Sequence, residues 1–215
     1  FFLSFFVAPK KEVTLAQNQG SFNLTEFKQS FKHLRLLFAI SFLFFLGRFN
    51  DGVIMLYLKK QGFPEWFYLS TIALFNLVML VVSPIIGICM DKKNAGTALL
   101  LISAALFFFN ILFYNVALAP WAFTCLGLMF WGIQRAGAQI AFPAIILRKI
   151  PAKYYGAAIG AYYLLSGIGI FIASIISGHL AQISFSYIFL LSGIFSLCAF
   201  GLTLYTIRSI QLAKE

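Results

Sequence analysis

Three charged side chains interrupt long apolar segments of the chain: Arg48, Asp51 and Arg135. Charge is costly inside a lipid bilayer, so such side chains usually face a water-filled cavity or one another and mark a transport pathway. An arginine guanidinium suits a carboxylate or phosphate, which it binds with two parallel hydrogen bonds. Two arginines and one aspartate leave one positive charge uncompensated. Three partners are able to balance it: a carboxylate from a part of the protein outside this chain, water in a cavity, or an anionic substrate. We predict a binding site for a small solute, with an anion as one such counter-charge.

Neighbouring side chains would complete this site. Asn50 lies between Arg48 and Asp51, and Gln134 and Gln139 flank Arg135 in the sequence. Trp131 lies one helical turn before Arg135 and is placed to stack on its guanidinium. The predicted substrate-binding residues are Arg48, Asp51, Arg135, Asn50, Gln139 and Trp131.

Asp51 has a second predicted role. A carboxyl group in a cavity of low dielectric can carry a coupling proton, although the neighbouring Arg48 opposes protonation. A purely structural interpretation also stands. Arg48 and Asp51, three residues apart on one helix, would neutralise each other, and Arg135 would pair with Asp51 or with backbone carbonyls. The two interpretations differ in whether the arginines line an open cavity or are sealed in pairs.

The composition places these residues in a membrane protein. Of the 215 residues, 61% are hydrophobic and 10% are charged, with a mean hydropathy of +0.92. A soluble domain is typically about 25% charged. A spanning helix needs about 20 apolar residues, and the segments long enough are 36–58, 66–90, 95–119, 121–147, 154–181 and 185–207. Barrel strands would alternate in polarity, which these segments do not. We predict an all-α membrane protein with six transmembrane helices.

The basic residues indicate the orientation of this bundle. Two of them, Lys59 and Lys60, follow the first span. Twelve lie in the segments that would share the opposite side: Lys10, Lys11, Lys28, Lys32, Arg35, Lys92, Lys93, Arg148, Lys149, Lys153, Arg208 and Lys214. By the positive-inside rule both ends of the chain are cytoplasmic, in a plasma membrane or a bacterial inner membrane. Despite the net charge of +10, no continuous basic face is predicted, so we expect no nucleic-acid partner.

The chain divides into four predicted parts. Residues 1–8 resemble the end of a preceding transmembrane helix, because this apolar stretch is too short to span a bilayer. Residues 9–35 form a cytoplasmic connector whose amphipathic stretch lies on the inner leaflet before the chain turns into the membrane. Residues 36–207 form the bundle, and 208–215 a cytoplasmic tail. We expect the chain to lack the N-terminal half of its protein.

Small residues recur at four-residue spacing in the fourth and fifth spans, which lets helix backbones approach closely. The repeats are Gly132 and Ala136, Gly137 and Ala141, Gly156 and Gly160, and the series Gly169, Ala173 and Ser177. We interpret them as tight packing, with sliding surfaces for transporter gating as the alternative.

The loop after the second span carries a recognisable motif. Gly87, then three residues, then Asp91, Lys92 and Lys93 resemble the loop signature of the major facilitator superfamily. The signature's later basic residues are absent, as is common in the second half of such transporters. The resemblance implies the C-terminal six-helix half of a twelve-helix bundle, built from two inverted three-helix repeats. It also implies that the first and fourth helices line the central cavity, and these are the helices that carry the three charges.

We therefore predict a secondary active transporter that moves a small solute, with an anionic metabolite as the leading class, by alternating access and with proton coupling as a further hypothesis. Efflux of amphipathic drugs is the alternative within transporters, and a non-transporting membrane scaffold the alternative outside them. No catalytic residues, metal ligands or cofactor are predicted, so we do not expect an enzyme. The predicted partners are the solute, the lipid bilayer and the N-terminal half.

Overall fold

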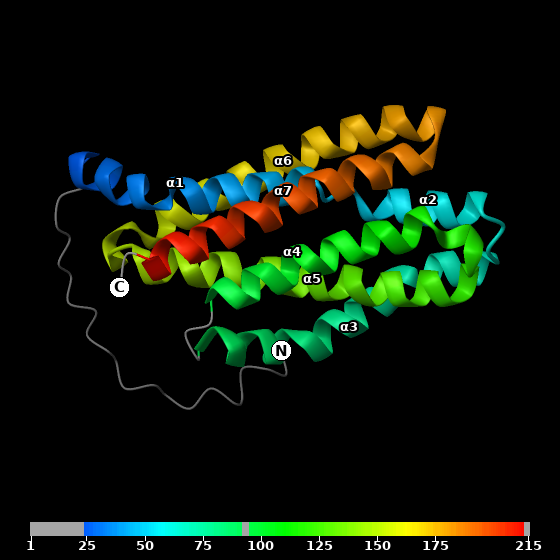
Figure 1. Ribbon diagram of the computed structural model, residues 1–215, viewed down its shortest axis with the longest axis horizontal. Coiled ribbons are helices and arrows are strands. Elements are labelled where there is room, and N and C mark those ends of the chain that lie inside the picture. The colour runs from blue at the N-terminus through cyan, green and yellow to red at the C-terminus, as the bar shows by residue number, and fades with distance from the viewer. Residues whose placement is uncertain (1–23, 92–94, 213–215) are drawn as a thin grey trace, which may run out of the picture.

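A computed structural model describes residues 24–91 and 95–212, and the chain is helical throughout these two ranges apart from short connections (Figure 1). The long helices lie roughly along one direction, side by side. In chain order the elements are α1 (Leu24–Leu46), α2 (Asp51–Lys60), α3 (Glu65–Asp91), α4 (Ala95–Tyr114), the 3-10 helix η2 (Val116–Leu118), α5 (Pro120–Lys149), the 3-10 helix η3 (Ala152–Tyr154), α6 (Tyr155–Ile183) and α7 (Phe185–Leu212).

Five segments of the described chain are long and apolar enough to cross a membrane. They are Leu34–Lys60, Glu65–Met90, Gly96–Tyr114, Ala152–Ile183 and Phe185–Arg208. Helix α5, the fourth of the six predicted spans, is not among them, although its 30 residues exceed the length required. Gln134, Arg135 and Gln139 lie in its middle and lower its hydropathy. The helix that departs from a plain apolar span is thus one of the two that carry the charges.

The first predicted span differs in shape from the expectation. We predicted one helix over 36–58, preceded by a turn near residue 35. Instead α1 runs without a turn from Leu24 to Leu46, and a break separates it from α2. The sequence explains the break, because Asn50 is a strong helix N-cap and Asp51 favours a first helical turn. Arg48 and Asp51 therefore lie on either side of an interruption, and not on one helical face.

The break is held against α7. The Ser192 hydroxyl donates a hydrogen bond to the carbonyl oxygen of Gly47. A Cβ atom at Gly47 would lie 3.2 Å from the Ser192 carbonyl oxygen and 3.3 Å from Cβ of Phe195, so only glycine fits without displacement. A backbone carbonyl freed by a helix break needs such a partner where water is excluded.

Helix α2 ends in a glycine cap that turns the chain into α3. Gly62 has a φ of 81°, which favours glycine over residues with a side chain. Its N–H bonds to the Lys59 carbonyl at 3.1 Å, and the Phe63 N–H to the Leu58 carbonyl at 3.1 Å. This pair of bonds is the Schellman motif. It fixes the end of the first span just after Lys59 and Lys60.

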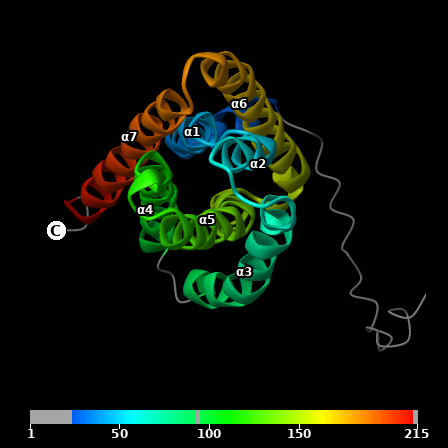
Figure 2. The same cartoon turned by 90° about the vertical axis from the view of Figure 1, so that its right-hand side faces the viewer.

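The helices form an open, curved assembly when viewed along the bundle (Figure 2). Helix α4 packs against α5 and α7, α5 also packs against α3, and α1 packs against α6 and α7. Helix α3 lies at the edge, and apolar side chains such as Leu77, Leu80 and Val81 are more than half exposed along it. Exposed apolar surface of this extent is expected where lipid or another apolar surface replaces water.

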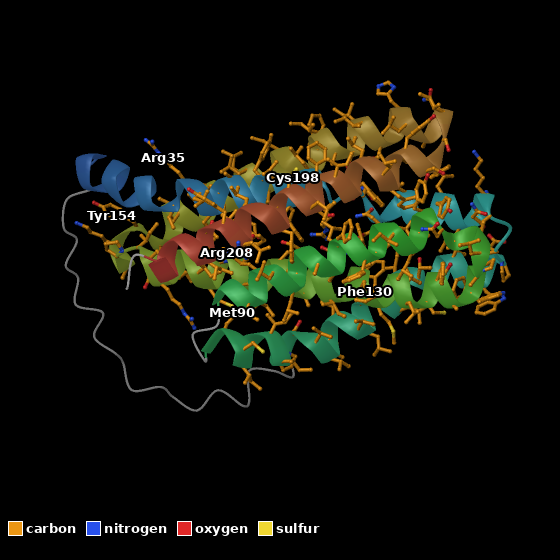
Figure 3. All side chains as sticks on the ribbon, in the orientation of Figure 1. Arg35, Met90, Phe130, Tyr154, Cys198 and Arg208 are labelled. Carbon is orange, nitrogen blue, oxygen red and sulfur yellow. The ribbon has the colours of Figure 1, made fainter. Side chains whose placement is uncertain are left out.

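The two ends of the bundle differ in their basic residues. The start of α1 and the end of α7 lie at the same end (Figure 1). Arg35, Tyr154 and Arg208 lie in that half of the molecule (Figure 3). Lys59 and Lys60 close α2 at the opposite end. Among the described basic residues, Arg35 and Arg208 therefore lie at one end, and Lys59 and Lys60 at the other.

Aromatic side chains fill the centre of the bundle. Phe49 lies at the helix break, and its ring centroid is 5.3 Å from Trp131 of α5, 6.0 Å from Phe109 of α4 and 5.8 Å from Phe189 of α7. All four side chains are at most 3% exposed. Rings in offset and edge-on pairs stabilise a core beyond their buried area. The break that carries the charges is thus anchored by a rigid aromatic cluster.

Candidate functional site

Asp51 owes its position to the start of α2. The Asn50 side-chain oxygen accepts a hydrogen bond from the Gly52 N–H at 2.8 Å and so caps the helix. Asp51 is the first residue of α2 and its acidic first-turn residue. The partial positive charge at a helix N-terminus stabilises a carboxylate there. The predicted Asn50 is exposed, and its side-chain oxygen is used in this cap.

Both carboxylate oxygens of Asp51 bind donors from α5. The Trp131 indole Nε1–H donates to Oδ1 at 2.9 Å. The Arg135 guanidinium Nη1 forms an ion pair with Oδ2. The Arg135 and Asp51 side chains are 23% and 27% exposed, so the pair borders open space without being fully solvated. Charge-assisted hydrogen bonds of this kind are about twice as strong as neutral ones. The structure thus joins three predicted site residues into one cluster.

Trp131 is placed differently from our prediction. We expected its ring to stack on Arg135, and this was wrong. The ring stacks on Phe49 with an interplanar angle of 28°, and the Arg48 Cζ lies 5.9 Å from its centroid. Arg135 instead lies over the Phe75 ring of α3, with its Cζ at 5.1 Å. Trp131 donates its N–H to Asp51 and packs in the core, whereas Arg135 reaches toward α3. Being 0% exposed, Trp131 positions Asp51 and offers no open surface to a solute.

Arg48 is the member of the group that remains without a counter-charge. The structural interpretation paired it with Asp51, but the helix break separates the two, and Asp51 pairs with Arg135. Within residues 24–91 and 95–212, Arg48 has no side-chain hydrogen bond and no ion pair. Its side chain is half-buried and lies near the Trp131 ring. A half-buried guanidinium without a carboxylate partner is costly and therefore suited to an incoming anion.

The two glutamines near Arg135 differ from each other. Gln139, predicted to bind substrate, is exposed on α5 and forms no hydrogen bond with the other described residues. Gln134 is 0% exposed, and neither atom of its amide has a partner among the described residues. A buried amide without a partner is uncommon and costs stability. Gln139 is thus at the surface of α5, whereas Gln134 is enclosed in the bundle.

A family model described as the Major Facilitator Superfamily matches the chain over residues 1–174 and again over 37–213. The chain belongs to the major facilitator superfamily. Members of this superfamily are membrane transporters and not enzymes, and the described helices are those of an integral, multi-pass membrane protein. No similar protein among those of curated function and no similar solved structure was found. The family thus supports transport in general, and the residues of the site must be argued from the geometry.

The loop motif of the superfamily is only partly visible. A Cβ atom at Gly87 would meet nothing within 4 Å, so Gly87 makes no close helix contact among the described residues. The side chains of Asp91 and Lys92 lie outside the described residues. The conformational role of this motif stays a prediction.

Three residues that support the site were missed from the sequence. Phe75 of α3 underlies Arg135, and Ser192 of α7 binds the carbonyl at the helix break. Tyr162 of α6 donates its hydroxyl to the Ala138 carbonyl of α5 at 2.9 Å. Their partners come from distant helices, so nothing in their local sequence indicated them. The break itself was signalled by Gly47 followed by Asn50 and Asp51, the residues of a helix start.

Proposed function

We propose that this chain is the C-terminal half of a secondary active transporter, that it moves a small anionic solute by alternating access against an N-terminal six-helix half, and that Arg48 contacts the solute. The observation that carries the proposal is the division of charge in the cluster. Asp51 is occupied by Arg135 and Trp131, so Arg48 is left to meet a negative charge. An arginine in a partly dry site binds carboxylates and phosphates well because it is weakly hydrated and has several donors.

The same geometry bears on proton coupling. We retain Asp51 as the candidate. Each carboxylate oxygen keeps a second lone pair for a proton, but protonation would remove the negative charge that pairs with Arg135. Proton binding at Asp51 would therefore weaken the link between α2 and α5.

A thermal-shift screen of the complete protein in detergent tests the anion proposal. The probes are inorganic phosphate, carboxylates, hydrophobic cations and sugars, each added to wild type and to Arg48→Gln. A solute that binds only the folded state raises the melting temperature. We expect stabilisation by one class of anion, which Arg48→Gln removes. The matched control is Arg35→Gln, because Arg35 is an exposed arginine of the same helix region outside the cluster.

Two results of the screen would contradict the proposal. If an anion stabilises wild type and Arg48→Gln equally, Arg48 is structural. If no anion acts and Arg48→Gln only lowers the melting temperature, the scaffold interpretation gains support.

One observation favours drug efflux as a second candidate. A crevice of about 380 Å³ lies between α3, α4 and α5, and its lining is apolar, including Ile85, Ile86, Cys89, Phe108 and Phe130. Drug-sized apolar molecules commonly occupy pockets of about 300–1,000 Å³. The charged residues of the cluster do not line this crevice. Stabilisation by hydrophobic cations, retained in Arg48→Gln, would favour this second function.

A further inference from the structure

We propose that Asp51 determines the charge of the transported anion, and that by neutralising Arg135 it restricts the site to solutes with a single negative charge. This inference rests on the proposed function and names the substrate class of the same site. Its basis is the placement of three charged groups around one tryptophan, and each step below uses a contact in that cluster.

Both oxygens of the Asp51 carboxylate have partners within the bundle. Oδ1 accepts from the Trp131 indole at 2.9 Å, and Oδ2 pairs with Arg135. Trp131 cannot turn away, because it is fully buried, stacks on Phe49 and lies 4.6 Å from the Phe109 ring centroid. Asp51 is therefore held between a fixed neutral donor and a cation. Arg135 is neutralised by this pairing and has little charge to offer a solute.

Trp131 contacts Asp51 and Arg48 with different parts of its indole. The edge of its indole faces Asp51, and the face of its ring lies 5.9 Å from the Arg48 guanidinium carbon. No described carboxylate forms an ion pair with Arg48. Arg48 thus keeps one positive charge that the described residues do not cancel. This is a site for one negative charge, beside a closed ion pair.

The net charge of the cluster then decides which anion fits. A monoanion bound at Arg48 makes the group of two arginines, one aspartate and the solute electrically neutral. A dianion leaves one negative charge next to the Asp51 carboxylate, in surroundings where charges interact more strongly than in water. Replacing Asp51 by asparagine releases Arg135 and presents two guanidinium groups. The variant should therefore prefer a solute with two carboxylates.

Four proteins separate this proposal from a structural role. Wild type has a net cluster charge of one positive, Asp51→Asn of two, and Arg135→Gln of none, since two arginines and one aspartate are present. The double variant Asp51→Asn with Arg135→Gln returns to one. A residue that only holds the fold together would not restore a charge preference when its partner is also removed. The double variant also removes both members of the ion pair, which avoids a buried charge left unpaired.

The experiment measures affinity in the complete protein from the concentration dependence of its melting temperature. The probes are straight-chain monocarboxylates of two to six carbons, each compared with the dicarboxylate of equal length, at about pH 8, where every carboxyl group is ionised. Wild type should bind at least one monocarboxylate about tenfold more tightly than its dicarboxylate partner. Asp51→Asn should reverse this order, Arg135→Gln should lose affinity for both, and the double variant should recover the wild-type order.

The failures of the two proposals are distinguishable. If carboxylates bind wild type but Asp51→Asn keeps its preference, or the double variant behaves like Asp51→Asn, Asp51 does not set the charge and the anion proposal survives. A wild-type preference for dicarboxylates overturns the inference in the same way. If no carboxylate or phosphate shifts the melting temperature of wild type, the anion proposal fails and this inference fails with it.

Discussion

Helices α5 and α6 both carry glycine and alanine at four-residue spacing, and their glycines meet different surroundings. On α5 a Cβ atom at Gly132 would lie 2.8 Å from the Phe75 carbonyl oxygen of α3, and one at Gly137 would overlap Ile102 of α4. On α6 a Cβ atom at Gly156 or Gly160 would meet nothing within 4 Å, whereas one at Gly169 would lie 3.1 Å from Cβ of Phe45 of α1. The same sequence pattern therefore closes interfaces along α5 and in the second half of α6, and leaves the first half of α6 open.

The difference matters because α5 supplies residues of the charge cluster. Helix α5 is fixed between α3 and α4 and supplies Trp131 and Arg135. Helix α6 packs mainly on α1 and leaves a broad exposed face with Tyr163, Leu164 and Phe171. A smooth apolar face of this kind suits close approach by another helix. We attribute the α5 pattern and the Gly169 repeat of α6 to internal packing, and expect Gly156 and Gly160 of α6 to meet the proposed N-terminal half.

The largest expected effect is the loss of transport when this second half is absent. Reconstituted alone in liposomes, the 215-residue chain should show no uptake of the solute found in the screen, because alternating access needs two bundles. Co-expression of the N-terminal half as a separate chain should restore uptake and provides the control. Uptake by the isolated chain would show that the open α6 face needs no partner.

A substitution on each glycine pattern tests the packing difference directly. Gly132→Leu should destabilise the chain by about 3 kcal/mol or more, because backbone of α3 lies where the new side chain must go. Gly160→Leu, the matched control on α6, should change stability by less than about 0.5 kcal/mol. The measurement is the free energy of unfolding of the 215-residue chain in detergent, followed by circular dichroism. Equal losses at both positions would remove the distinction between the two helices.

Only part of the fold and of the charge cluster could be predicted from the sequence. The class, the all-α fold and the family followed from apolar segment length and from the Gly87–Asp91 motif, since these depend on local composition. The membership of Arg48, Asp51 and Arg135 in one group also followed, because charge in apolar segments is rare. The pairing within the group did not, since it depends on the break at Gly47 and on Phe75 and Ser192 from other helices. Whether a glycine faces a neighbour or open space is likewise a tertiary property.

A smaller effect is expected when α5 loses the hydrogen bond that Trp131 donates to Asp51. Trp131→Phe keeps the stacked ring but removes the N–H that binds Asp51, so it should cost about 1.5–3 kcal/mol, the range for a hydrogen bond to a charged group. Trp121→Phe is the control on the same helix, because Trp121 is 51% exposed and its Nε1 has no partner among the described residues. The midpoint of thermal unfolding measures both. If the two variants behave alike, the Trp131–Asp51 bond contributes nothing to the cluster.

The smallest effect concerns a hydrogen bond that joins α6 to α5 through the hydroxyl of a tyrosine. Tyr162 donates to the Ala138 carbonyl of α5 at 2.9 Å, and its neighbour Tyr163 is 58% exposed on the open face of α6. Tyr162→Phe should cost about 1 kcal/mol or less, as interhelical hydrogen bonds in membranes do, and Tyr163→Phe should cost nothing measurable in the isolated chain. In the complete protein Tyr163→Phe becomes informative. A loss of stability there, absent from the isolated chain, would mean that the open face of α6 is covered by the other half, whereas no loss in either setting would mean that this tyrosine faces lipid.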